Sequence, residues 1–129
     1  MIVLDTSILV SIECKEEKVI KKILEISERY GRIFYITFMN LFEFLLGLKI
    51  RGIKKRKEAI SFLERFSVLN STEATSKIMA ELKFKYDKKG EVISLADLII
   101  ASIVIEKGMI LVTSDKDFEK IEELRKIII

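Results

Sequence analysis

The chain begins with MIVLDTSILV (residues 1–10), and the interpretation of the whole fold starts from this stretch. Three apolar residues run directly into Asp5, and Thr6 and Ser7 follow before the apolar pattern resumes. The apolar run predicts a short buried strand over residues 2–5, although aspartate is disfavoured in strands and costly to bury without a partner. Asp5 therefore either caps the next segment or holds a ligand.

The composition restricts the kinds of function that the chain can have. Its 129 residues, 50% hydrophobic and 33% charged, predict a single globular domain over residues 1–129. Histidine is absent and Cys14 is the only cysteine. This excludes an intrachain disulfide, Ser-His-Asp and Cys-His catalysis, and zinc bound by histidine. Any catalysis must use carboxylates, lysine, tyrosine, hydroxyls or a metal ion held by oxygen atoms.

The distribution of apolar and basic residues gives a first indication of location and partners. The longest strongly apolar stretch, residues 98–105, is far shorter than the ~20 residues of a membrane span. Because Asp5 interrupts the first apolar run and no basic segment precedes it, we expect no signal peptide and a cytoplasmic protein. The net charge is +3, and basic runs at 49–57 and 83–89 are either solvated helix faces or contacts for nucleic-acid phosphates.

Hydrophobic spacing and punctuation by glycine predict strands that alternate with helices. We expect strands over residues 2–5, 32–37, 67–70, 109–113 and 124–129. We expect helices over residues 8–13, 16–30, 38–50, 53–65, 72–89 and 94–106, with a helical turn at 116–121. Ser7, Thr37 and Ser94 are predicted N-caps, and either Ser71 or Thr72 is predicted to cap the helix that ends near residue 89. This order predicts an α/β fold with a parallel sheet of about five strands covered by helices on both faces.

Acidic residues stand where such a fold binds ligands, beyond the carboxyl ends of its strands. Asp5 ends the first strand, and Asp115 follows the fourth. Asp97 lies in the first turn of the helix that leads into the fourth strand, where the helix dipole favours its ionised form. Glu43 is the one acid in the apolar stretch FMNLFEFLLGL (38–48). It either occupies a solvent-facing stripe or points inward to a partner.

Four converging carboxylates would repel one another unless a positive charge compensates. Oxygen ligands with a net negative charge suit a hard cation such as Mg²⁺ or Mn²⁺, and two such ions ~4 Å apart can stabilise both oxygens of a phosphodiester displacement. Each acid also has an ordinary explanation: Asp97 and Asp115 as cap or turn residues, and Glu43 as a solvent-facing side chain. Asp5 is the hardest to explain in this way, because it ends a buried strand.

Three segments together resemble a known family, and they cover nearly the whole chain in order and spacing. They are MIVLDTSILV (1–10), FEFLLGL (42–48) and SLADLIIASIVIEKGMILVTSDKDFEKI (94–121). These resemble the PIN domain, and within it the VapC-type toxins of toxin–antitoxin pairs. The resemblance implies a single PIN domain over residues 1–129, a three-layer fold with strand order 3-2-1-4-5, and a Mg²⁺- or Mn²⁺-dependent endoribonuclease.

The resemblance also assigns roles to individual residues. The positions that match the family's catalytic and metal-binding acids are Asp5, Glu43, Asp97 and Asp115. The positions that match its supporting residues are Thr6, Ser7, Thr113 and Asp117; the family often has asparagine at the Ser7 position. Either Asp115 or Asp117 can be the last acid of the site. We favour Asp115, because Asp117 matches the aspartate of an Asp-Phe pair that usually packs behind the site.

A reaction and a set of partners are implied by the same resemblance. Activated water would attack RNA in line and leave 5′-phosphate and 3′-hydroxyl ends, which needs no histidine. The implied partners are an RNA substrate, a second copy of the chain and a small VapB-like antitoxin that covers the site. The helix over 38–50 is so apolar that part of it is expected to form an interface, with packing against residues 53–66 as the alternative.

Other interpretations of the first strand and its aspartate remain. Response-regulator and haloacid-dehalogenase phosphotransfer domains also place an aspartate after their first strand. However, the second class needs another acid two residues later, where Ser7 stands, and Lys116 matches the late lysine of the first class only loosely. A non-catalytic PIN-like RNA-binding or scaffold module is a further alternative, as is a housekeeping RNA-processing nuclease.

Overall fold

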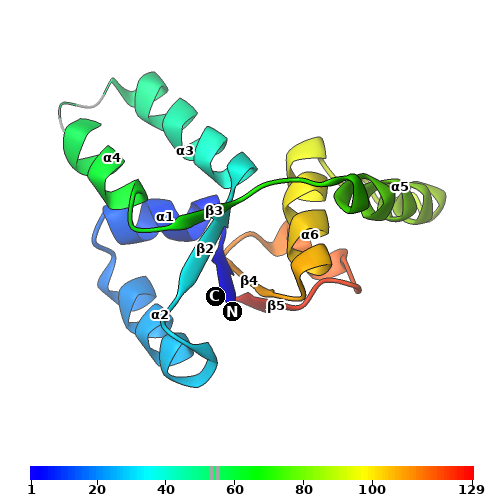
Figure 1. Cartoon of the computed structure of the whole chain (residues 1–129), viewed down its shortest axis with the longest axis horizontal. Coiled ribbons are helices and arrows are strands. Elements are labelled where there is room, and N and C mark those ends of the chain that lie inside the picture. Colours follow the sequence, from blue (N-terminus) through cyan, green and yellow to red (C-terminus); the bar gives the residue numbers. More distant parts are fainter. Residues whose placement is uncertain (53, 55) are drawn as a thin grey trace.

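A five-stranded parallel sheet forms the centre of the protein in the computed structural model, which describes residues 1–52, 54 and 56–129. The strands are β1 (Ile2–Leu4), β2 (Phe34–Thr37), β3 (Ser67–Leu69), β4 (Ile110–Thr113) and β5 (Lys126–Ile128). Their order in the sheet is β3-β2-β1-β4-β5, and every neighbouring pair is parallel. The expected three-layer α/β fold and strand order 3-2-1-4-5 are therefore confirmed (Figure 1).

Helices cover both faces of this sheet. They are α1 (Thr6–Glu13), α2 (Glu17–Tyr30), α3 (Phe38–Arg51), α4 (Arg56–Leu63), α5 (Glu73–Lys88) and α6 (Leu95–Lys107), with the short 3₁₀ helix η1 (Lys116–Lys120) before β5. Figure 1 shows α1 to α4 on one side of the sheet and α5 and α6 on the other. Two residues of the helix predicted over 53–65, residues 53 and 55, lie outside the described ranges. Among the described residues, α4 confirms the predicted helix.

Alternation along β1 divides the core into two apolar layers, because successive strand residues point to opposite faces. Ile2 and Leu4 pack with residues of α1 to α4, whereas Val3 packs with α5, α6 and η1. All three side chains are fully buried. A strand buried on both faces has to be apolar throughout, which explains why the polar residues of the chain's first segment appear only after Leu4.

Two helices begin with reciprocal capping boxes that share one pattern. At the start of α3, the Asn40 N–H donates to Thr37 Oγ1, while the Asn40 side-chain oxygen accepts from the Thr37 N–H. At the start of α5, Thr75 takes the same role opposite Thr72. Ser94 caps α6 by accepting from the Asp97 N–H at 3.2 Å. The predicted caps at Thr37 and Ser94 are thus confirmed.

The predicted cap at Ser7 is wrong. Helix α1 begins at Thr6, one residue earlier, and Asp5 is its N-cap residue without a side-chain cap hydrogen bond. Ser7 lies inside the first turn, and its hydroxyl donates to Asp5 Oδ2 at 3.1 Å. The carboxylate that follows β1 is therefore free of the capping role and accepts bonds from other segments.

Among the described residues, no helix combines the length and apolarity that crossing a bilayer requires.

Candidate metal centre

The carboxyl ends of β1 and β4 meet at one edge of the sheet. Leu4 pairs with Val112, and the Asp5 N–H donates to the Val112 carbonyl oxygen at 2.9 Å. Asp5 and Thr113 therefore emerge side by side. This is the edge at which parallel α/β sheets bind ligands, and it brings together two segments more than a hundred residues apart in the sequence.

The Asp5 carboxylate is only 5% exposed and is held by donors from three segments. Its Oδ2 atom accepts from the Thr113 hydroxyl at 2.6 Å and from the Ser7 hydroxyl at 3.1 Å. Its Oδ1 atom accepts from Asn40 Nδ2 at 3.1 Å. Burial raises the pKa of Asp5; the hydroxyl donors oppose this change, and the negative charge of Asp115 adds to it.

Glu43 points toward this group and not to a solvent stripe. The Thr6 hydroxyl donates to Glu43 Oε1 at 2.7 Å, which joins α3 to the first residue of α1. The Glu43 side chain is half-buried, and burial is the main cause that raises its pKa. The charges of Asp5 and Asp115 raise the pKa further, so Glu43 lies within electrostatic range of both.

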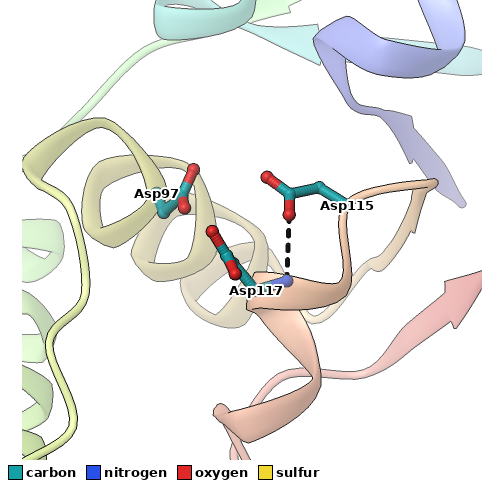
Figure 2. A group of neighbouring side chains, drawn as sticks. All are labelled: Asp97, Asp115 and Asp117. Atoms are coloured by element: carbon teal, nitrogen blue, oxygen red, sulfur yellow. Dashed lines mark hydrogen bonds between the residues drawn. The ribbon is translucent and has the colours of Figure 1, made fainter.

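Three other carboxylates converge on one point in front of the sheet edge. Asp97 from α6 and Asp115 and Asp117 from the segment after β4 each offer an oxygen, and these oxygens lie within 4.8 Å of one another (Figure 2). The Asp115 carboxylate accepts from the Asp117 N–H at 2.9 Å, and the Asp115 N–H donates to Thr113 Oγ1 at 3.0 Å. Three anionic oxygens at this spacing fit a hard divalent cation.

The electrostatic balance of the site supports the same interpretation. The pKa of Asp97 is raised to about 6, first by burial, then by Asp115, and to a smaller extent by Asp5 and Glu43; the Ser94 hydroxyl acts in the opposite direction. Mutual repulsion of this kind is relieved by a cation, because a bound ion favours the ionised form of each carboxylate. The residues present therefore fit an oxygen-ligated metal ion.

All four acids expected from the sequence face the same edge of the sheet, but they divide into two groups. Asp97 and Asp115 belong to the tight three-carboxylate group, and Asp117, the alternative last acid, joins them there. Asp5 and Glu43 lie outside that group and accept hydrogen bonds from hydroxyl and amide donors. The geometry thus keeps both Asp115 and Asp117 as candidates for the last acid.

Sequence reasoning did not identify Asn40, which is fully buried beside Asp5. Its amide nitrogen donates to Asp5 Oδ1 and to Thr6 Oγ1, both at 3.1 Å. One signal was present: a polar residue stands three positions after the Thr37 cap in an otherwise apolar segment. A capping box explains why the Asn40 side chain has an oxygen that accepts from the Thr37 N–H. It does not explain the side-chain nitrogen that donates to another segment.

Residues of the two basic runs have other neighbours than the acids of the site. Lys49 and Arg51 are at the C-terminal end of α3, about 9 Å and about 12 Å along the helix axis from Glu43 at ~1.5 Å per residue. Lys55 of the same run lies outside the described residues. In the second run, Lys85 forms an ion pair with Glu123 at 3.0 Å.

Comparison with known proteins agrees with this fold. The family model of the PIN domain matches residues 2–124. Comparison with curated protein sequences gives no match. Among solved structures, the chain resembles the VapBC2 complex of Rickettsia felis bound to a promoter DNA fragment, with 26% identity and a TM-score of 0.83 over 100% of this chain and 99% of that chain.

Two further structures show the same fold. VapBC-1 from nontypeable Haemophilus influenzae has 24% identity and a TM-score of 0.80 over 99% of this chain and 98% of that chain. The DNA-bound VapBC of Salmonella typhimurium has 21% identity and a TM-score of 0.79, with coverage of 98% and 96%. Both are described as VapBC structures, and at these identities the likeness shows a shared fold. Since the family model spans nearly the whole chain, the protein belongs to the PIN domain family.

Proposed function

We propose that the chain is a metal-dependent endoribonuclease and the toxin of a type II VapBC-like toxin–antitoxin pair. One observation carries the proposal: in a PIN domain, Asp97, Asp115 and Asp117 meet within electrostatic range of a buried Asp5 at the carboxyl edge of the sheet. PIN domains as a family are nucleases, and an oxygen-only site without histidine fits phosphodiester hydrolysis assisted by a metal ion.

Asp97 and Asp115 would hold Mg²⁺ or Mn²⁺, with Asp117, Asp5 and Glu43 as further oxygen donors. The bound cation would draw charge from the phosphate oxygens and lower the pKa of a water molecule. Thr113 and Ser7 would keep the Asp5 carboxylate in one orientation, because the three side chains are hydrogen-bonded to one another. The half-buried Glu43 carboxylate, held by the Thr6 hydroxyl, would orient a water molecule and accept its proton.

We expect the purified chain, freed of any partner, to cut RNA with Mg²⁺ or Mn²⁺ and to lose the activity in EDTA. Asp5→Asn and Asp97→Asn should each reduce the cleavage rate by about 100-fold or more, because each removes a charge that the cation needs. The measurement is gel analysis of an end-labelled, structured RNA pool. Product ends are assigned separately, and hydrolysis of this type leaves 5′-phosphate and 3′-hydroxyl groups.

Asp87→Asn is the matched control, since Asp87 is an exposed aspartate of α5 that pairs with Lys83. It should cleave RNA at the wild-type rate. Cleavage that persists in EDTA, or 3′-phosphate ends, would contradict the proposed reaction. A folded wild-type chain that binds RNA without cutting it under either metal would support the non-catalytic PIN-like module instead.

The raised pKa of Asp97 gives the proposal a pH dependence. Because the folded state holds this proton up to about pH 6, the contribution of Asp97 to stability without metal is present at low pH and is lost as pH rises through about 6. A metal ion must displace the same proton. We therefore expect Mn²⁺ affinity, measured by calorimetry, to fall about tenfold for each pH unit below this pKa. In Asp97→Asn this part of the pH dependence should disappear; an unchanged profile would exclude Asp97 as a ligand.

A groove on the face opposite α5 and α6 supports the antitoxin part of the proposal. It has a volume of about 550 Å³ and lies between α2, α4 and the segment before β2. Its lining includes Ile20, Leu24, Ile33, Phe62 and Phe66, together with Arg32 and Arg65. An apolar groove with two arginines fits a segment that carries both apolar and acidic side chains. We propose that a VapB-like antitoxin lays such a segment here.

We expect the tagged chain to co-purify with the product of a reading frame that flanks its gene when the two are expressed together. Leu24→Glu should abolish this co-purification, because it adds an acid to the apolar part of the groove. Phe84→Glu is the control, since Phe84 is exposed to a similar extent, 64% against 60% for Leu24, but lies on α5 outside the groove. Retention by both variants would place the partner elsewhere.

A second copy of the chain is the occupant we propose for the exposed apolar side of α3. Phe42, Leu46 and Ile50 remain exposed there, as expected for a helix too apolar for the core alone. Sedimentation of the purified wild-type chain should show a dimer, and Phe42→Glu should shift it to a monomer. The Phe84→Glu variant should remain a dimer. A monomeric wild type at micromolar concentration would contradict the proposal.

A further inference from the structure

All the hydrogen-bonding groups of the Asn40 side chain are used, and they divide between two tasks. The amide oxygen accepts from the Thr37 N–H at 3.0 Å and from the Thr37 hydroxyl at 2.8 Å. The amide nitrogen donates to Asp5 and to Thr6. Because donors face the oxygen and acceptors face the nitrogen, this orientation of the amide satisfies every partner. The oxygen thus completes the cap of α3, and the nitrogen contacts the site.

We propose that Asn40 is a positioning residue of the metal centre, an inference that rests on the proposed function. It directs one oxygen of Asp5, and it fixes the Thr6 hydroxyl that holds Glu43. Thr6 Oγ1 accepts from Asn40 and, in turn, donates its own proton to Glu43 at 2.7 Å. One neutral amide therefore sets the direction of two carboxylates on different segments without adding charge to an acidic site.

Capping alone does not account for asparagine at this position. The equivalent residue of the α5 capping box is Thr75, whose hydroxyl accepts from the Thr72 N–H at 2.8 Å. A hydroxyl therefore suffices to complete such a box in this chain. The Thr75 hydroxyl also donates to Glu106 Oε2 at 2.7 Å, so a contact with another segment is not by itself the difference. What asparagine adds in α3 is a second polar atom, a nitrogen that donates both to Asp5, 35 residues earlier in the chain, and to Thr6. The additional contacts are directed to the acidic site.

The comparison between the two capping boxes supplies the test variant. Asn40→Thr keeps a hydroxyl for the Thr37 cap, as in α5, and removes the amide donor from Asp5 and Thr6. We expect the dissociation constant for Mn²⁺, measured by calorimetry, to rise by about 10-fold or more, as is typical when a partner that orients a metal ligand is lost. For RNA cleavage, we expect a lower kcat with an unchanged KM.

Thr75→Val is the matched control, because it removes a buried hydroxyl from a capping box whose acidic partner is Glu106 and not an acid of the site. It should lower the melting temperature and leave the Mn²⁺ dissociation constant unchanged. If Asn40→Thr binds Mn²⁺ as the wild type does, Asn40 only caps α3 and the inference is wrong. An equal loss of affinity in Thr75→Val would also overturn it, since the effect would then be one of general stability.

A measurement on the unmutated chain covers the case in which Asn40→Thr does not fold. The sequence has two asparagines, Asn40 and Asn70, and no glutamine, so its NMR spectrum contains two side-chain amide pairs. Asn70 is exposed and serves as an internal reference. Saturating Mg²⁺ should shift the Asn40 pair and leave the Asn70 pair in place. A stationary Asn40 pair under conditions of proven metal binding would overturn the inference.

These readouts separate the inference from the proposed function. A wild type that binds Mn²⁺, with weaker binding in Asn40→Thr, supports the positioning role even if no RNA is cut, and only the proposed activity then fails. RNA cleavage with unchanged metal binding in Asn40→Thr keeps the nuclease and removes the role of Asn40. A wild type that binds neither Mn²⁺ nor Mg²⁺ would overturn both.

Discussion

The buried carboxylate of Asp5 is the constraint on which the site depends. An ionised group in the interior costs several kcal/mol unless hydrogen bonds replace the lost water. Here Thr113, Ser7 and Asn40 provide those bonds from the end of β4, from α1 and from α3. Because each donor belongs to a different element, satisfying one carboxylate also fixes how these elements meet at the sheet edge.

The same edge collects more negative charge than it neutralises. Burial and mutual repulsion raise the pKa values of Asp5, Glu43 and Asp97, the last to about 6. A fold carries such repulsion when other parts supply the stability, and here two apolar layers pack on opposite faces of the sheet. Functional sites often have an unfavourable electrostatic free energy at one point, while the sequence elsewhere in the chain suits its local structure. It is also the reason why a cation is the natural ligand.

Much of the fold followed from local patterns. The strand and helix positions, the Thr37 and Ser94 caps, and the presence of acids after β1 and β4 depend on residues within a few positions of one another. The strand order followed from the resemblance to the PIN family and not from the spacing. The Ser7 cap was wrong because α1 begins one residue earlier, at Thr6. The Ser7 hydroxyl donates to Asp5 and accepts from the N–H of Ser114, 107 residues later, a contact that a local pattern does not reveal.

The sequence by itself determined which elements form and which acids stand at strand ends, since apolar periodicity and capping are properties of neighbouring residues. It also restricted the possible chemistry, because a chain without histidine and with a single cysteine has mainly oxygen atoms to offer any metal ion. Only the tertiary structure decided that Asp117 joins Asp97 and Asp115, and that Asn40 reaches Asp5. These contacts depend on how α3 and α6 pack against the sheet, and that packing sets the direction of side chains that are far apart in the sequence.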